Sequence, residues 1–305
     1  MKLHLGIKSD TVQNRFSYEW LFGLMRSLGV VYLQLGGFFE MPFLEDGYYH
    51  EIRDTAERYG VRIKSLYARH RITAGFFTTN PHLEKAARRI YEIYIHAGAV
   101  LGVDYVGANA GVLYQDHPEY RDEGIGCYLS HIRELMQLAK ESGIRGLTVE
   151  TMSSSYEWPT TPEEIRWLAC ELGEYHERHA DSTTPFYILG DVSHGFANRE
   201  GAVVHSNYEI FESTIPYMCE FHFKNTDSIF NSTFGFSDEE REMGVVDLKK
   251  VKKIIYGNED LWPVEELVGY LEIPGPKFGR DYSDPLLETQ LTSSIEALHR
   301  YFPPS

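Results

Sequence analysis

Short apolar runs alternate along the chain with longer segments of helical period. The runs are rich in β-branched and aromatic residues and are bounded by turn formers, which is typical of strands. Eight runs are found, at residues 4–8, 30–37, 61–68, 103–111, 144–152, 186–194, 219–227 and 269–276. Regular alternation of strand and helix predicts a parallel sheet, because each crossover places a helix against the sheet.

The segments between the runs carry helix signals of their own. Residues 81–98 repeat apolar side chains at helical spacing from Leu83 onward, and Gly98 is the predicted end of this helix. Residues 161–179 begin with the sequence TPEE, a capping box with proline at the first helical position. Residues 284–302 place four aliphatic side chains on one face and form the last predicted helix.

Eight strand–helix units in a chain of 305 residues predict a closed (β/α)8 TIM barrel. A doubly wound open sheet is the rival, but it usually carries a glycine-rich phosphate loop after its first strand, and the sequence GIKSDTVQN has none. We expect residues 1–305 to form a single α/β barrel domain with a long irregular loop at about 228–246. A loop of that length in a compact domain is usually functional or disordered.

The formal net charge of −16 narrows the choice of partners. Nucleic acids and anionic membrane surfaces both attract basic faces, so neither is expected to bind here. Three cysteines without a CxxC pair predict a reducing compartment rather than a disulfide framework. The sequence shows no signal peptide and no apolar run of about 20 residues. We therefore expect a soluble cytoplasmic protein that acts on a small molecule, with a homo-oligomeric state left open.

In a (β/α)8 barrel the reactive side chains stand at the carboxyl ends of the strands. Alternation predicts which residues point into the barrel, because the apolar neighbours should face the helices. The last four runs direct four polar side chains at one mouth: Glu150, Asp191, His222 and Glu272. Any one of these acids could simply be salt-bridged, but three carboxylates together repel one another and favour a divalent cation.

The donor set also bears on the identity of the metal. Oxygen ligands with one imidazole suit Mn²⁺, Mg²⁺ or Co²⁺ better than a thiolate-type zinc site. We expect one divalent cation, with Mn²⁺ as the first choice and Mg²⁺, Co²⁺ or Zn²⁺ as alternatives.

Four short motifs resemble those of the xylose isomerase-like TIM barrels, the sugar phosphate isomerase/epimerase superfamily. They are LTVE at 147–150, DVSH at 191–194, FHFKNTD at 221–227 and YLEI at 270–273. The superfamily includes ketose 3-epimerases, hydroxypyruvate isomerases, inosose dehydratases and endonuclease IV. The resemblance extends over nearly the whole chain as an order of strands and helices, and it implies that the four residues named above bind one metal.

Together with the geometry of the barrel, the resemblance implies that Glu150 and Glu272 are both metal ligands and acid/base groups. We expect a divalent-metal-dependent isomerase or epimerase of a keto sugar or sugar phosphate, acting by proton abstraction through a metal-stabilised enediolate. Two bases on opposite faces of the substrate suit epimerisation, whereas one base suits isomerisation. The alternative is an inosose dehydratase-like reaction, in which water is lost at the same site.

Two candidate substrate contacts lie close to the expected ligands. His194 follows Asp191 in the stretch GDVSHGF, where its residue types also fit an ordinary turn. The resemblance implies that His194 contacts the substrate. Lys224 shares a face with His222 and could bind an anion, or it could form a salt bridge to Glu220 or Asp227.

Three further candidate substrate contacts stand at other strand ends and loops: Asn109, Arg69 and Trp158. Trp158 could stack on the apolar face of a sugar or simply be packed. The chain departs from the tagatose-type epimerases in one respect. Those epimerases carry an arginine shortly after the seventh-strand histidine, and this chain has Ser228 and Ile229 in that region. Lys224 is the candidate to take the role of that arginine. Asn109 occupies a position where endonuclease IV needs a histidine, which argues against DNA repair.

Overall fold

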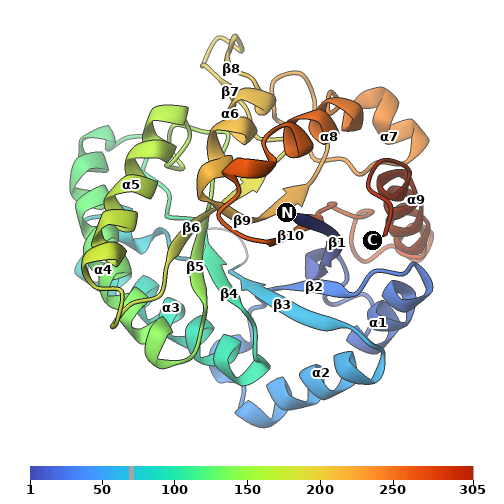
Figure 1. Cartoon of the computed structure of the whole chain (residues 1–305), viewed down its shortest axis with the longest axis horizontal. Coiled ribbons are helices and arrows are strands. Elements are labelled where there is room, and N and C mark those ends of the chain that lie inside the picture. The colour runs from blue at the N-terminus through green and yellow to red at the C-terminus, as the bar shows by residue number, and fades with distance from the viewer. Residues whose placement is uncertain (69–71, 305) are drawn as a thin grey trace.

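A closed barrel of eight parallel strands forms the centre of the computed structural model, which describes residues 1–68 and 72–304 (Figure 1). The strands are β1 (Lys2–Lys8), β2 (Tyr32–Gly36), β3 (Arg62–Tyr67), β4 (Tyr105–Ala108), β5 (Gly146–Glu150), β6 (Phe186–Asp191), β9 (Met218–Phe223) and β10 (Glu266–Leu271). They follow one another around the ring in this order, and β10 pairs with β1 to close it. The predicted (β/α)8 TIM barrel is confirmed.

Helices surround the barrel and cover the outer faces of its strands (Figure 1). They are α1 (Tyr18–Ser27), α2 (Asp46–Arg58), α3 (Pro81–Leu101), α4 (Arg121–Glu141), α5 (Pro162–Arg178), α6 (Asn207–Thr214), α7 (Asp238–Met243), α8 (Leu248–Gly257) and α9 (Leu286–Tyr301). Their apolar stripes and the outward side chains of the strands form one continuous buried core. A small antiparallel hairpin of β7 (Phe196–Ala197) and β8 (Val203–His205) is added between β6 and α6.

Several helix boundaries follow directly from local sequence. The side chain of Asn80 accepts from the backbone N–H groups of the first turn of α3. In α5 the hydroxyl of Thr161 accepts from the N–H of Glu164, whose carboxylate accepts in return from the backbone of Thr161, so the predicted capping box is present. The predicted apolar stripe of α9, which includes Leu287 and Ile295, is fully buried.

The predicted end of α3 at Gly98 is wrong. The helix continues to Leu101, and Gly102 ends it in the left-handed conformation with φ 72°. Gly98 is small for a different reason: a Cβ there would lie 2.7 Å from Cγ2 of Val106, so the glycine lets α3 pack closely on β4. Leu83, which was expected on the buried face, lies in the first turn of α3 and is 42% exposed.

The segment 228–246 is less irregular than its composition predicts. Asn225, which precedes the segment, forms an isolated antiparallel bridge with Phe234, which lies within it. The helix α7 occupies most of the second half of the segment. Ser237 and Glu240 cap α7 reciprocally. The acidic residues from Asp238 to Glu242 therefore belong to a short helix and not to an irregular loop.

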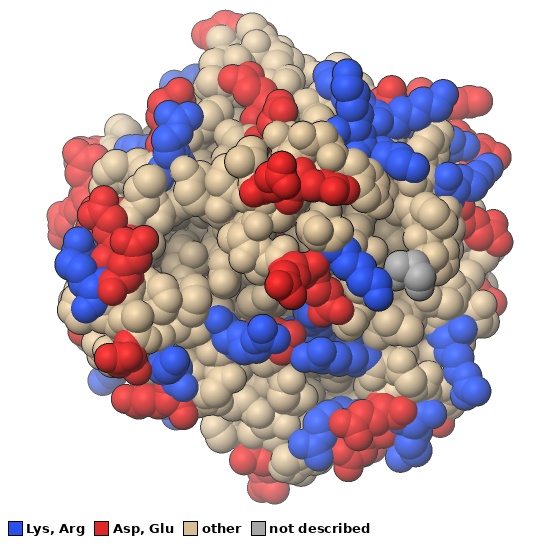
Figure 2. Space-filling view, in the orientation of Figure 1, with Lys and Arg blue, Asp and Glu red and all other residues tan. Residues whose placement is uncertain are grey.

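The surface carries both signs of charge in spite of the net charge of −16. Figure 2 shows acidic and basic side chains interspersed on one face, with basic ones gathered around α8, whose sequence includes Lys249, Lys250, Lys252 and Lys253. Among the helices that the structure describes, none combines the length and the apolar character needed to cross a membrane.

Candidate metal centre

Four adjacent strands bring together the four predicted ligands. Glu150 and Asp191 end β5 and β6, His222 lies in β9, and Glu272 directly follows β10. Their ligand atoms all lie within 4.8 Å of one another. Register explains the convergence, because Asp191 is paired with His222 across β6 and β9, and the chain alternation turns both side chains inward.

The imidazole of His222 is held between two carboxylates and an amide. Its Nδ1 lies 3.0 Å from Oε1 of Glu150 and 3.1 Å from Oε2 of Glu272. On the other side Nε2 lies 2.7 Å from Oε1 of Gln34. The Gln34 amide donates to Ser65 and Glu220 through its nitrogen, which leaves Oε1 as the acceptor, so we assign a proton to Nε2 of His222. Nδ1 is then the atom that faces the cluster.

Asp191 is oriented by the turn that follows it. Its Oδ1 accepts from both the backbone N–H and the hydroxyl of Ser193, each at 2.7 Å. Its Oδ2 is fully buried, lies 2.7 Å from Nζ of Lys224, and has no hydrogen bond of good geometry to any described residue. A buried carboxylate oxygen left in this way is suited to a cation. The stretch GDVSHGF is therefore both a turn and part of the candidate metal site, because the turn orients the carboxylate of Asp191.

Two lysines balance the charge of the carboxylates. Nζ of Lys8 lies 2.7 Å from Oε1 of Glu272 and 3.1 Å from Oδ2 of Asp10. Nζ of Lys224 lies 2.7 Å from Asp191 and 3.4 Å from Oε2 of Glu272. Lys224 thus takes neither of the two salt-bridge partners predicted for it, because it points into the cluster.

The electrostatics keep the carboxylates ionised. Burial on its own would raise the pKa of Glu150, but the charge and hydrogen bond of His222 outweigh it and lower the pKa to about 2. Burial is likewise outweighed at Glu272, where Lys224, Lys8 and His222 hold the pKa well below its usual range. The pKa of His222 is raised to about 9, because the carboxylates of Glu272 and Glu150 outweigh its burial.

The residues present fit a divalent cation. Three carboxylates and one imidazole nitrogen converge, and this donor set is typical of Mn²⁺, Mg²⁺, Co²⁺ or a non-thiolate Zn²⁺ site. Gln34 supplies the outer hydrogen bond that metal-binding histidines usually make.

His194 lies beside this cluster, as predicted. Its Nδ1 is 2.5 Å from the carbonyl oxygen of Thr151, and therefore carries a proton. Its Nε2 accepts from Nζ of Lys224 at 2.9 Å and lies 3.5 Å from Oδ2 of Asp191. His194 and Lys224 are thus positioned together at the edge of the candidate centre, and both are less than a tenth exposed.

No hydrogen bond, ion pair or ring contact among the described residues joins the other predicted substrate contacts to this cluster. Asn109 is buried after β4 and donates to Sδ of Met152. Trp158 is 3% exposed and packs against Phe77 and Tyr128, so its indole belongs to the core rather than to an open sugar-binding face. Arg69 lies outside the described residues.

The sequence interpretation missed Lys8 and Gln34. Both point into the barrel from the first two strands, where Lys8 ends the first apolar run and Gln34 alternates with two leucines. The alternation rule applied to the last four runs would have found them in the first two. Glu220, one layer deeper, accepts from Ser65 at 2.8 Å, and its burial raises its pKa to about 7.

A cavity of about 440 Å³ opens beside the candidate centre. Lys8, Asp10 and Glu272 line its inner end, and Thr233 and Phe278 line its outer part. The volume lies in the range of small-molecule sites.

No protein-family profile and no curated protein matches the sequence of this chain. Solved structures do match in three dimensions. The D-psicose 3-epimerase of Clostridium cellulolyticum, determined with D-tagatose, gives a TM-score of 0.70 at 13% identity over 99% of both chains. An IolI protein with a bound zinc atom gives 0.70 at 15% identity over 100% of both chains. AsbF of Bacillus anthracis, assigned as a 3-DHS dehydratase, gives 0.60 at 14% identity over 98% of both chains.

These similarities are similarities of fold, because the sequence identities are low. They confirm that the chain resembles the sugar isomerase and epimerase barrels, as the four motifs indicated.

Proposed function

We propose that this protein is a divalent-cation-dependent isomerase or epimerase of a keto sugar or its phosphate, with Mn²⁺ as the cation. One observation carries the proposal: three carboxylates and an imidazole converge at the carboxyl ends of four adjacent strands. The D-psicose 3-epimerase that shares the fold supports a ketose as the substrate class.

Glu150, Asp191, His222 and Glu272 would hold the cation. When bound, it would supply a Lewis acid that polarises the substrate carbonyl and its neighbouring hydroxyl. Glu150 and Glu272 approach His222 from β5 and from the end of β10, so they stand on different sides of the cluster. Their lowered pKa values keep both as carboxylates that can accept a proton.

The proton transfer is carried by the two glutamates. One accepts the proton from the carbon beside the carbonyl, and the electron pair of the broken C–H bond moves toward the carbonyl oxygen. In epimerisation the other returns a proton to the same carbon from the opposite face. In isomerisation the proton goes to the adjacent carbon. Lys224 and His194 lie where they could hydrogen-bond substrate oxygens.

A dehydratase is the second candidate function. The fold similarity to AsbF favours it, and the same pair of carboxylates could remove a proton and then protonate a departing hydroxyl. The two reactions differ in their products, since only the dehydratase releases water and leaves a double bond.

Deuterium exchange tests the proposal. The Mn²⁺-loaded protein is incubated in D₂O with a panel of ketoses and their phosphates, and carbon-bound deuterium is measured by NMR. We expect exchange beside the carbonyl, reduced on the order of 10² to 10⁴-fold in Glu150→Gln. Glu266→Gln, at the opposite end of β10, is the matched control and should exchange normally. No exchange with any substrate and any of Mn²⁺, Mg²⁺, Co²⁺ or Zn²⁺ would contradict the proposal.

A further inference from the structure

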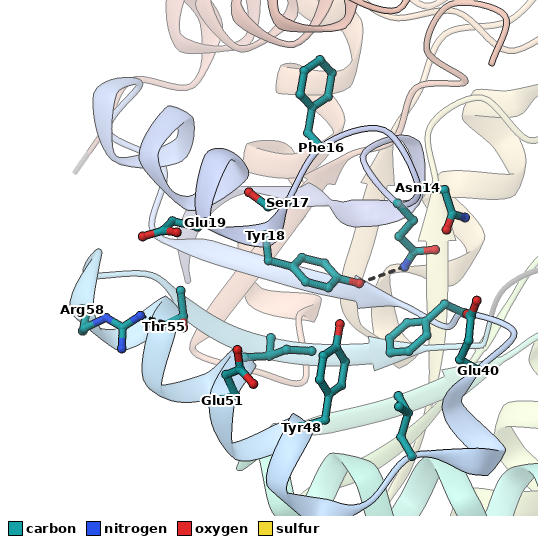
Figure 3. Close-up of a pocket in the computed structure, with 14 residues that line it drawn as sticks. Asn14, Phe16, Ser17, Tyr18, Glu19, Glu40, Tyr48, Glu51, Thr55 and Arg58 are labelled. Carbon is teal, nitrogen blue, oxygen red and sulfur yellow. Dashed lines mark hydrogen bonds between the residues drawn. The ribbon is translucent and has the colours of Figure 1, made fainter. Parts of the chain in front are cut away.

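A second cavity, of about 610 Å³, lies at the same end of the barrel between α1 and α2 (Figure 3). The β1–α1 and β2–α2 connections form part of its wall, together with the first turn of α1 and one side of α2 from Tyr48 to Arg58. These connections follow the carboxyl ends of their strands, which is the face where the candidate metal centre opens. The mechanism proposed above does not use this cavity.

The lining of the second cavity suits the two faces of a sugar ring. Tyr18, Phe38 and Tyr48 contribute aromatic rings, and the rings of Phe38 and Tyr48 meet edge to face at 6.3 Å. Tyr18 lines the cavity, and its hydroxyl accepts from the amide nitrogen of Gln13 at 3.4 Å, the contact drawn as a dashed line at Tyr18 in Figure 3. Aromatic rings pack against the C–H faces of sugars, while amide and hydroxyl groups pair with sugar hydroxyls.

Gln13 and Asn14 line this cavity and also the one beside the metal centre. Asn14 adopts the left-handed conformation with φ 63° and is exposed at the point where the two cavities meet. A ligand that reaches from Glu272 across Asn14 would therefore enter the space between α1 and α2. A molecule with two rings can therefore place one ring in each of the two adjoining cavities.

The charges around the two cavities disfavour a phosphate. Glu40 and Glu51 line the second cavity, and Arg58 at its outer edge donates to the hydroxyl of Thr55. Beside the metal centre, the cations are already paired, with Lys8 bound to Glu272.

The guanidinium of Arg15, which also lines the first cavity, is paired with Asp284 at 2.9 Å. Among the described residues that line the two cavities, every lysine and arginine thus has a carboxylate or hydroxyl partner. A phosphate in the second cavity would also meet the carboxylates of Glu40 and Glu51. Neutral hydroxyls, by contrast, are good donors to those carboxylates.

We propose that the substrate is an uncharged glycosylated ketose, whose keto sugar reacts beside Glu272 and whose second ring occupies the cavity between α1 and α2. This inference rests on the function proposed above and narrows its substrate class. We assign Tyr48, on α2, as a specificity residue that contacts the second ring and does not contact the reacting atoms.

The test compares three ketoses with the Mn²⁺-loaded full-length protein in D₂O: D-fructose, fructose 6-phosphate, and isomaltulose, which is fructose carrying a glucosyl group on O6. We expect kcat/KM for exchange to be at least about tenfold higher for isomaltulose than for either of the others. Tyr48→Ala should remove that preference, so that the ratio of kcat/KM for isomaltulose to that for fructose falls to about one. Phe39→Ala, the neighbouring exposed ring that does not line the cavity, should keep it.

A binding measurement separates this inference from the proposed function. Saturation-transfer NMR with isomaltulose should show contact of the glucosyl protons in the wild-type protein and loss of that contact in Tyr48→Ala and in Phe38→Ala. If fructose exchanges but isomaltulose is no better, or if the preference survives Tyr48→Ala, the inference fails and the isomerase stands. If no ketose exchanges, the proposed function fails for these substrates, and only glucosyl contact that depends on Tyr48 would support the subsite.

Discussion

Lys224 places a positive charge among the proposed ligands in the absence of a metal. Its ammonium lies 2.7 Å from Oδ2 of Asp191 and also contacts Glu272 and His194. A lysine in this position can serve the substrate, but it also competes with a divalent cation for the same carboxylate oxygens. On the proposed function, Lys224 would couple metal affinity to substrate binding.

Replacing Lys224 by methionine should separate these two roles. We expect Lys224→Met to bind Mn²⁺ more tightly, by roughly tenfold or about 1.4 kcal/mol, because the competing charge is gone. Turnover should fall, since the substrate loses a hydrogen-bond donor. Calorimetric metal titration and exchange rates measure the two effects, with Lys253→Met on the outer face of α8 as the control. Weaker metal binding in Lys224→Met would show that the lysine does not compete.

Gln34 fixes the orientation of the histidine ligand. It is fully buried, and its Oε1 accepts from Nε2 of His222 at 2.7 Å while its amide nitrogen donates to Ser65 and Glu220. This arrangement directs Nδ1 toward the carboxylates of the proposed metal site.

Gln34→Leu should therefore weaken the metal site indirectly. We expect Mn²⁺ affinity to fall on the order of 10 to 100-fold, the range found when an outer hydrogen bond to a ligand is removed. Gln137→Leu, on α4, removes a glutamine that bonds only to Tyr175 and should leave affinity unchanged. Equal affinities in Gln34→Leu and the wild type would mean that packing alone orients His222.

At the scale of elements, two helical glycines show that the effect of a side chain on stability depends on what the helix packs against as well as on helix propensity. Gly98 in α3 sits against β4, where a Cβ would lie 2.7 Å from Val106 and 3.1 Å from Val103. Gly126 in α4 faces solvent with no atom within 4 Å of the same position. The sequence alone does not show this difference, because it depends on which distant segments pack against each glycine.

Substitution by alanine should change the free energy of unfolding in opposite directions at Gly98 and Gly126. Gly98→Ala should destabilise the fold by about 1 to 3 kcal/mol, the usual cost of overpacking. Gly126→Ala should stabilise it by roughly 0.5 to 1 kcal/mol, because alanine costs less backbone entropy in a helix. Urea unfolding measures both free energies. A neutral or stabilising Gly98→Ala would indicate that α3 can shift away from β4 at little cost.

The contact between α3 and α4 contains a cysteine with an unusual environment. Burial raises the pKa of the Cys127 thiol to about 11, and the negative charge of Glu84 across the contact adds to the effect. Glu84 also pairs with Nε2 of His131 at 2.7 Å. The thiolate, which is the reactive form, is therefore scarce at neutral pH.

Alkylation kinetics test this assignment. The rate of iodoacetamide reaction at Cys127 should keep rising with pH up to about 11, because the thiolate fraction grows until the pH passes the pKa. Glu84→Gln removes the repelling charge, lowers the pKa and should speed reaction at about pH 8. Mass spectrometry of the same digests follows Cys170 on α5 as an internal reference. A rate that levels off near pH 8.5 would be inconsistent with the raised pKa.

At the scale of the whole molecule, alternation of apolar runs and helical segments was enough to predict the closed barrel. It also predicted Glu150, Asp191, His222 and Glu272 as one cluster, because inward direction in a strand follows from a period of two. Alternation along a strand is therefore enough to predict a site when each of its residues lies at or near the end of a strand.

What the sequence could not predict depends on contacts between distant segments. Lys8 reaches Glu272 only because β1 closes against β10, and Gln34 reaches His222 across the barrel interior. Trp158 looked like a surface for a sugar, but α4 and its preceding segments cover it. Gly98 looked like a helix end because its packing against Val106 is invisible in one dimension.

The most direct test of the central claim is an equilibrium titration of the chelator-stripped protein with Mn²⁺, with the free ion measured by EPR. We predict one tightly bound ion per chain, displaced by Zn²⁺ or Co²⁺. Binding should be lost in Asp191→Asn and kept in Asp238→Asn, a change at an exposed acid on α7. No tight binding in the wild type, or binding that Asp191→Asn leaves unchanged, would contradict the assignment of the four strand-end residues as a metal centre.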